Sequence, residues 1–364
     1  MKRIVCMCMS CLIALSLTGC GGQKASSGSA EASSGADGGA EPVVLKMATT
    51  NSTAMWEDTE LDLMAAEKYF IQELPKRTGG RYEVKIFLDG QLASGTKEQV
   101  QGIKSGAFDI TEMGTGSVGE FTQAFMELNV PYLFKNQDVV DEVLLGEVGR
   151  DMLARSADDI GNVKPLFYAD NGFRMLTHAS KVIKTPADLK GVKIRVQPDP
   201  IMIATFEALG ASVVSVPYSE LFTALQQKLV DAQENPATNL YNAKLYEVQK
   251  TCTVTNHMFT AFVYYMNADT FNGMSVEDQK AVMELSAECQ KIRADKMKEV
   301  TEKYIEKLKE AGLEFYELSN EELQAFSDCM VNGVWPQCTQ EMGQERWDKL
   351  QNAVKEAEKK LNIQ

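Results

Sequence analysis

The segment Lys190–Pro236 limits the possible folds more than any other part of the chain. Its apolar runs, helix-forming stretches and turn residues predict strand, helix, strand, helix and strand in succession. This order is typical of βα units and of a largely parallel sheet. It places Arg195 and Asn235 at strand ends, where an arginine can hold a carboxylate through two parallel hydrogen bonds.

The beginning of the chain predicts export and a lipid anchor. Two basic residues precede the apolar run Ile4–Leu17, which is too short to span a bilayer as a permanent helix. The run ends in Leu-Thr-Gly-Cys, which resembles the lipobox of bacterial lipoproteins. We therefore expect residues 1–19 to be a signal peptide and Cys20 to carry the lipid, the alternative being an ordinary secretory signal with a chance cysteine. Residues 20–42, mostly Gly, Ser and Ala, predict a flexible tether outside the cytoplasm, held at the outer face of the membrane or in a periplasm.

Composition sets limits on the rest of the chain. Without residues 1–19, it holds 35 basic and 51 acidic residues, a net charge of −16. Nucleic acid is excluded as a partner because its binding needs a basic face. An anionic ligand would have to be held by local arginines against the overall field. About 320 residues follow the tether, which is enough for two domains of ordinary size.

The cysteine and histidine content argues against metal sites and catalysis. Besides Cys20, four cysteines remain after the signal peptide. A bridge between Cys329 and Cys338, one between Cys252 and Cys289, and free buried thiols are all open alternatives. No CxxC or Cys/His spacing indicates a metal, and no cofactor is expected. The chain has two histidines, no nucleophile elbow and no phosphate-binding glycine loop, so we expect no enzymatic activity.

Strands and helices alternate before the segment 190–236, and one long helix follows it. Strands are predicted at 44–48, 82–88, 108–113 and 163–168, and helices at 58–77 and 97–105. Ser275–Asp278 is a capping-box pattern, and helix-forming residues continue to Ala311. A helix of about 37 residues is roughly 55 Å long, more than the width of one small domain. We therefore expect it to lie along two domains, with a coiled coil as the alternative.

Short motifs occur in a fixed order along the chain. They are Gly90-Gln91-Leu92, SGAFD at 105–109, VPY at 130–132, GVKIRV at 191–196, LGA at 209–211, PYSELFTALQ at 217–226, VDAQENP at 230–236 and KLYEVQKTCTVTNH at 244–257. Together they resemble the extracytoplasmic solute-binding proteins of the TRAP transporters, of the dicarboxylate-binding-protein type. The likeness extends from Leu45 to about residue 345. Ala232 and Ala93 replace glycines that are usual in that family, and Phe222 replaces a tyrosine.

The resemblance implies an α/β, two-domain, periplasmic-binding-protein-like fold. Crossing hinge strands would join the domains, and the long helix would span both. The domain ranges that we expect are 43–168 with 257–285, 169–256 with 286–335, and a C-terminal helical segment at 336–364. Closure would occur about the strands near residues 168 and 256.

The resemblance also implies which residues hold the ligand. Arg195, in the KIR strand, would form a salt bridge with the ligand carboxylate, and Arg174, after an Asn-Gly turn, would be the second arginine. Asn235 would reach the ligand, and Tyr218 would line the pocket floor. The residues alone leave other roles open: Arg195 could pair with Asp199, Arg174 could be a surface charge, Asn235 a turn former and Tyr218 a core residue.

Asn171 and Thr115 complete the expected site, because both lie where loops should meet the cleft. His257 is expected to be packed and hydrogen-bonded without contacting ligand. The ligand implied is a small organic acid, with a sugar acid such as a uronate first and a C4-dicarboxylate second. Its expected recipient is a TRAP membrane permease, although a sensory role toward a membrane receptor is also open. A monomer is the default expectation for such a protein.

Overall fold

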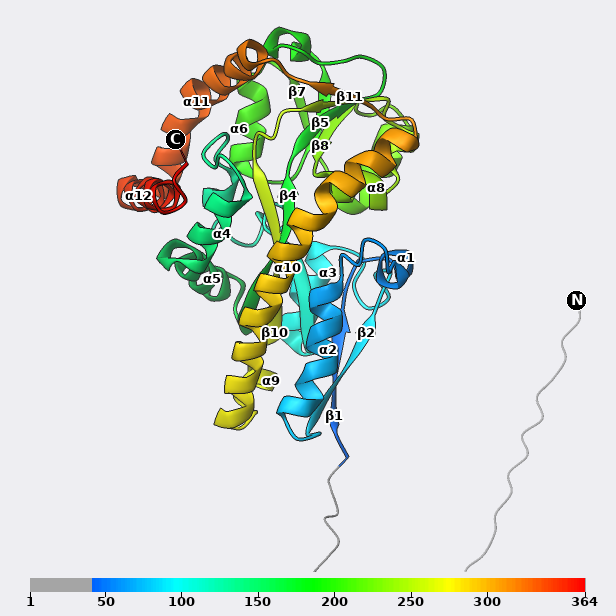
Figure 1. Cartoon of the computed structure of the whole chain (residues 1–364), viewed down its shortest axis with the longest axis vertical. Coiled ribbons are helices and arrows are strands. Elements are labelled where there is room, and N and C mark those ends of the chain that lie inside the picture. The colour runs from blue at the N-terminus through cyan, green and yellow to red at the C-terminus, as the bar shows by residue number, and fades with distance from the viewer. Residues whose placement is uncertain (1–40, 364) are drawn as a thin grey trace, which may run out of the picture. The chain divides into compact units, whose positions relative to one another are not determined.

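The computed structural model describes residues 41–363. The expected signal peptide, the lipidation site Cys20 and nearly all of the tether lie outside the described residues. Residues 41–363 form two mixed sheets surrounded by helices (Figure 1). Within this region, no helix combines the length and the apolar character needed to cross a membrane.

The first sheet has five strands. Its order is β2 (Tyr82–Phe87), β1 (Val43–Ala48), β3 (Ile110–Gly114), β10 (Phe259–Asn267) and β4 (Val163–Phe173). The strands β2, β1 and β3 are parallel neighbours, while β10 runs antiparallel to both β3 and β4. The carboxyl ends of β1 and β3 therefore meet at one edge, where parallel α/β sheets commonly bind ligands.

The second sheet has six strands. Its order is β11 (Glu314–Glu317), β9 (Thr251–Val254), β5 (Met175–His178), β8 (Ala232–Asn235), β6 (Lys193–Val196) and β7 (Ser212–Ser215). The strand-helix order predicted for Lys190–Pro236 is confirmed by strands β6, β7 and β8 and the helices between them. The register pairs Arg195 with Gln233 and Met175 with Asn235. Polar residues from β6 and β8 are thereby brought beside the start of β5.

The chain passes three times between the two sheets, twice through short connections between strands and once through the long helix Val276–Glu310, which leads from β10 to β11. Strand β4 stays paired with β10 as far as Phe173, and β5 begins at Met175, so the first passage is at Arg174. The second lies between Val254 and Phe259, and the two are joined because Arg174 N donates to Met258 O at 2.9 Å. The predicted domain boundary falls at residue 168, so the first passage, at Arg174, lies six residues after it. The domain ranges themselves stay a prediction.

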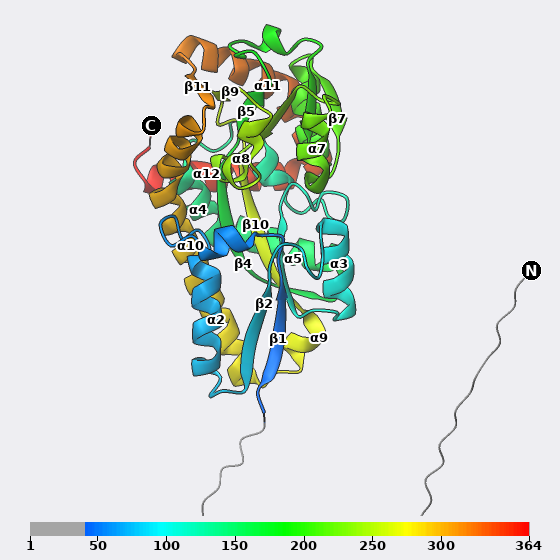
Figure 2. The same ribbon diagram turned by 90° about the vertical axis from the view of Figure 1, so that its right-hand side faces the viewer.

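Twelve α-helices surround the sheets of residues 41–363 (Figure 2). They are α1 (Thr53–Glu57), α2 (Ala65–Arg77), α3 (Thr96–Ser105), α4 (Gln137–Leu145), α5 (Glu147–Ile160), α6 (Pro200–Ala208), α7 (Leu221–Gln226), α8 (Ala237–Asn242), α9 (Ala268–Asn272), α10 (Val276–Glu310), α11 (Asn320–Met342) and α12 (Gln344–Lys360). Short 3-10 turns occur at Met126–Asn129, Pro186–Leu189, Tyr218–Glu220 and Leu245–Glu247.

The predicted long helix is confirmed as α10, which has 35 residues and is about 52 Å long at 1.5 Å per residue. Ser275 caps it by accepting from Asp278 N, and Gly312 follows it with a φ of 91°. It packs on α2 and β4 beside the first sheet and on α8 beside the second (Figure 1). The fold is therefore the expected two-sheet periplasmic-binding-protein type with one helix along both sheets. Because α10 packs on these elements, the coiled-coil alternative is wrong.

The structure also corrects one predicted helix. The segment 58–77 is helical only from Ala65 onward, in α2. Asp58 accepts hydrogen bonds from the backbone N–H groups of Glu60 and Leu61, which fixes a turn in place of the first helical residues. Asp62 then adopts a φ of 44°, which continues the interruption.

The cysteines of residues 41–363 are free thiols, one of the alternatives left open. Cys329 and Cys338 both lie on α11. Nine residues in an α-helix make about two and a half turns and a rise of about 13.5 Å, so the two side chains lie on opposite faces. Their Cα atoms are too far apart for a disulfide.

Candidate ligand-binding site

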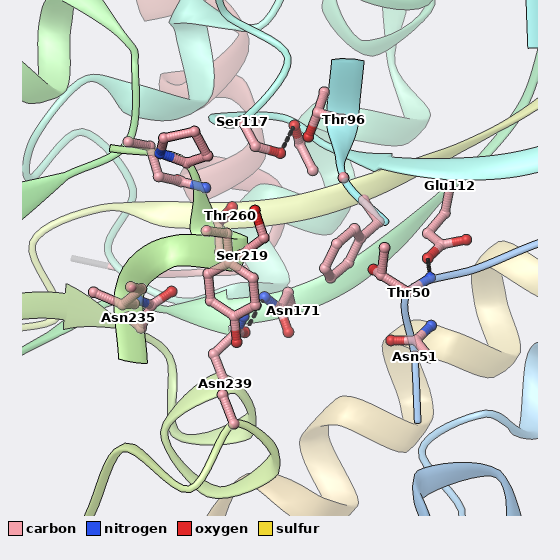
Figure 3. A pocket seen from close by; sticks show the side chains of 18 of the residues that line it. Thr50, Asn51, Thr96, Glu112, Ser117, Asn171, Ser219, Asn235, Asn239 and Thr260 are labelled. Atoms are coloured by element: carbon pink, nitrogen blue, oxygen red, sulfur yellow. Dashed lines mark hydrogen bonds between the residues drawn. The ribbon is translucent and has the colours of Figure 1, made fainter. Parts of the chain in front are cut away.

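A cavity of about 590 Å³ lies between the two sheets. Its walls come from the loops after β1 and β3 on one side and from the segments after β6, β7 and β8 on the other (Figure 3). Polar side chains dominate these walls. They include Thr50, Asn51, Ser117, Asn171, Gln197, Ser219, Asn235, Asn239 and Thr260. Such walls suit a ligand with several hydroxyl or carbonyl groups.

Arg174 lines the cavity and is held by a buried carboxylate. Its Nε and Nη2 both donate to the Glu234 carboxylate, and Nη2 also donates to Glu234 O at 2.6 Å. Both side chains are at most 1% exposed, so Arg174 is not the surface charge that the sequence allowed. Burial by itself raises the pKa of Glu234, but Arg174 and His257 outweigh it and hold that pKa below its usual value. Nη1 of Arg174 takes no part in these hydrogen bonds.

Arg195 is completely buried on β6, directly behind the cavity wall. Its Nε and Nη2 donate to Val216 O at 2.9 and 2.8 Å, while Nη1 has no hydrogen-bond partner. Arg195 does not line the cavity itself, whereas Gln197 and Tyr218 do. Burial lowers its pKa to about 10. A buried guanidinium nitrogen without a hydrogen-bond partner is energetically costly.

Asp199 is not the internal partner of Arg195 that the sequence allowed. Its carboxylate caps α6 by accepting from Ile201 N and Met202 N. Asn235 is 1% exposed and lines the cavity, with its Oδ1 3.2 Å from Arg174 Nη2 and its Nδ2 donating to Gln233 Oε1 at 2.5 Å. The amide is therefore fixed in orientation beside the arginine.

Asn171 and Tyr218 both line the cavity. Asn171 donates to Asn239 Oδ1 at 2.6 Å and accepts from Thr238 Oγ1 at 2.7 Å, which ties the end of β4 to α8. Tyr218 is half-buried, and burial raises the pKa of its hydroxyl. Its phenol therefore stays protonated at neutral pH and can donate to a ligand.

Thr115 lies just behind the wall and not on it. Its hydroxyl is 3.4 Å from that of Thr260, which does line the cavity. His257 is packed, as expected: its Nδ1 is 2.8 Å from Thr255 Oγ1, its ring packs edge-on against Phe206, and its Nε2 is 3.4 Å from Glu234 Oε2. Thr115 thus contacts a lining residue, and His257 lies beside the carboxylate that holds Arg174.

Two buried charged residues of the wall were missed by the sequence analysis. Glu112 lies on β3, and its Oε1 accepts from Thr49 Oγ1 at 2.7 Å and from Thr50 N at 3.2 Å. Arg293 lies on α10 and donates to Asp170 O and Leu63 O at 2.8 and 2.6 Å. An acid in an otherwise apolar strand was the one signal that could have indicated Glu112. Nothing local distinguishes Arg293 from the other charges of its helix.

The two walls approach each other closely at two glycines. Gly119 follows β3, Pro198 follows β6, and a Cβ atom at Gly119 would lie 2.7 Å from Pro198 O. A Cβ at Gly116 would lie 2.4 Å from Gln197 Oε1, but that side chain can move aside. At Gly119 the neighbour is backbone, so only glycine permits this close approach of the two segments, which belong to different sheets.

Among residues 41–363, no group of three His, Cys, Asp or Glu side chains is placed to hold a metal ion. The polar groups of the cavity are mostly amides and hydroxyls, with two arginines and the buried carboxyl group of Glu112. Chemically, this set can bind an anion with hydrogen-bonding substituents.

Known proteins match the chain over most of its length. Residues 53–341 match the family described as DctP, bacterial extracellular solute-binding protein, family 7. The 2,3-diketo-L-gulonate-binding periplasmic protein YiaO of Escherichia coli (strain K12) is 34% identical over 269 residues, which are 74% of this chain and 80% of that protein. The C4-dicarboxylate-binding periplasmic protein DctP of Rhodobacter capsulatus is 30% identical over 294 residues, or 80% of this chain and 85% of that protein.

The likeness extends to a solved structure. The sugar acid binding protein DctPAm from Advenella mimigardefordensis, in complex with galactonate, aligns with a TM-score of 0.79 at 28% identity, covering 87% of this chain and 99% of that one. Sequence and fold therefore agree with the resemblance carried by the motifs. The chain belongs to the DctP family of extracytoplasmic solute-binding proteins of the TRAP type, whose members bind solutes and are not enzymes.

Proposed function

We propose that this protein captures a small organic acid, most favourably a sugar acid such as a uronate, and delivers it to a TRAP membrane permease. The observation that carries the proposal is the buried Arg195, whose Nη1 has no partner behind a cavity that Arg174 also lines. The likeness to YiaO and to the galactonate complex supports a sugar acid. A C4-dicarboxylate is the second candidate, because one relative is a C4-dicarboxylate-binding protein.

In the proposed mechanism, the ligand carboxylate is held by both arginines. Each has two nitrogens engaged and Nη1 free of protein hydrogen bonds, so the carboxylate receives one nitrogen from each arginine. A neutral analogue is rejected because it would leave the buried guanidinium of Arg195 unpaired. Asn235 and Tyr218 add hydrogen bonds to the carboxylate or to a neighbouring hydroxyl.

A thermal-shift screen of the purified protein against mono- and dicarboxylic acids tests this function. An acid present at about 100 times its dissociation constant should stabilise the folded state by about 2.7 kcal/mol. Neutral sugars and amines of the same size serve as controls and should give no shift. Stabilisation by the neutral compounds but not by acids would show that the arginines do not define the ligand.

Closure of the two walls over the ligand is part of the proposal. It would proceed about the passages near residues 168 and 256, expelling water and strengthening the polar contacts. The close approach at Gly119 would then be a contact of the closed form.

Gly119→Ala is expected to weaken ligand binding by roughly 5- to 100-fold, since overpacking costs about 1–3 kcal/mol and Pro198 O is backbone that cannot swing away. Calorimetry gives the affinity, and small-angle scattering with saturating ligand should show a less compact protein. Gly95→Ala is the matched control, because its Cβ would meet nothing closer than Ser219 Oγ at 3.8 Å. Equal affinities for the two variants would exclude a role of the Gly119 contact in closure.

Anchoring through Cys20 is a further part of the proposal, supported by the lipobox-like residues 17–20. Cells grown with a labelled fatty acid should transfer the label to this protein. Cys20→Ser should lose it, and a variant that keeps the label would place the lipid elsewhere.

A further inference from the structure

Among residues 41–363, Arg195 is buried beside the cavity without a carboxylate within salt-bridge distance. Arg174 pairs with the one buried carboxylate next to it, that of Glu234. Arg293, the other buried arginine of the wall, has Glu67 3.7 Å from its Nη1. The remaining charged lining residues, Lys97, Glu98 and Glu120, are exposed at the surface.

Glu112 is a buried acid of the cavity wall. It is 2% exposed, and among residues 41–363 no lysine or arginine lies within salt-bridge distance of its carboxyl group. In Figure 3 it lies across the cavity from Asn235 and beside Thr50. Its Oε1 accepts two hydrogen bonds, whereas Oε2 has no partner. A carboxylate buried without a counter-ion is disfavoured, so the group stays in its neutral acid form.

Burial raises the pKa of Glu112 to about 8, and the nearby Glu67 on α2 adds to that rise, while the hydrogen bonds from Thr49 and Thr50 oppose it. On β10, Tyr264 donates to Glu67 Oε1 at 2.6 Å, and its own pKa lies well above the usual value because of burial. Thr49 and Gln99 contribute neutral contacts from β1 and α3, and Arg293 on α10 lies beside Glu67.

We infer that Glu112 is a specificity-determining residue which, as a neutral acid, restricts the site to ligands with a single carboxylate and a hydroxylated remainder. This inference rests on the proposed function and narrows its ligand class. A second carboxylate at the Glu112 end would be buried beside an acid, with no cation left to pair with it. Hydroxyl groups there instead meet Glu112, Thr50 and Asn51, which lie on the same side of the cavity in Figure 3.

Two matched pairs of acids test the inference by calorimetry. Galactarate differs from D-galactonate, and D-glucarate from D-gluconate, by a carboxylate in place of the terminal CH2OH group. At pH 7 the singly charged acid of at least one pair should bind roughly 100-fold or more tightly than its diacid, because an unpaired buried charge costs several kcal/mol. Equal affinities within a pair would overturn the inference while leaving the proposed function intact. Binding of neither pair would overturn both.

The pH dependence isolates Glu112. We expect only the protein with a neutral Glu112 to bind. The fraction of protein in that state falls from about nine-tenths at pH 7 to about one-tenth at pH 9. The apparent Kd for the singly charged acid therefore rises about tenfold. Glu112→Gln keeps the size of the side chain but cannot ionise, so its own Kd at pH 9 should equal its own Kd at pH 7. Glu83→Gln, an exposed site on β2, should follow the wild type. A flat wild-type profile, or a Glu112→Gln profile that rises equally, would overturn the role of Glu112.

Discussion

Arg195→Ala should abolish the stabilisation of the folded protein by organic acids. Truncating one partner of a buried, hydrogen-bonded charge pair costs about 2–5 kcal/mol, which is roughly a 30- to 4,000-fold loss of affinity. The comparison is the difference in melting temperature with and without acid, measured separately for each variant. Removing a buried guanidinium also changes the stability of the unliganded protein, so absolute melting temperatures are not compared between variants.

Arg195→Lys separates charge from geometry. Lysine keeps the positive charge but offers a point donor in place of the planar fork that donates to Val216 O. We expect weakened binding that is nevertheless stronger than that of Arg195→Ala. Unchanged acid stabilisation in Arg195→Ala would show that the carboxylate binds elsewhere, with Arg174 as the next residue to replace.

Glu234→Ala should lower the free energy of unfolding by about 3–5 kcal/mol, since it leaves the buried Arg174 guanidinium without its carboxylate. Urea unfolding followed by circular dichroism measures the loss. The matched control is Glu288→Ala, which removes the partner of Arg77 at 2.7 Å in a pair whose side chains are 26% and 44% exposed. That exposed pair should contribute only about 0–1 kcal/mol. Similar losses for the two variants would mean that burial adds nothing to the Arg174 pair.

The same pair predicts how stability depends on pH. Because the pKa of Glu234 is lower in the folded protein than its ordinary value of 4.5, the folded state holds this proton less tightly than the unfolded state. The contribution of the pair is therefore complete above pH 4.5 and is lost as the pH falls through the folded value. Glu234→Gln removes this titration, so its loss of stability relative to wild type should shrink in acid.

Local sequence determined most of the architecture. Residues 190–236 form the predicted order of strands and helices, because apolar periodicity and turn residues act over short distances. The long helix begins at the Ser275 cap and is followed by Gly312, as the capping pattern and the absence of Gly and Pro required. The helix predicted from Asp58 failed for an equally local reason, the hydrogen bonds of its own side chain to the following backbone.

The sequence by itself thus determined the fold class, the long helix and the placement of Arg195 and Asn235 at strand ends. The tertiary structure decided which charges neutralise one another. Arg174 meets Glu234, 60 residues away, because β5 and β8 pair in antiparallel register. The pKa of Glu112 is raised because the fold buries its side chain and brings Glu67, distant in the chain, near it. Charge pairing and pKa depend on long-range register and on desolvation, and neither is encoded in the spacing of neighbouring residues.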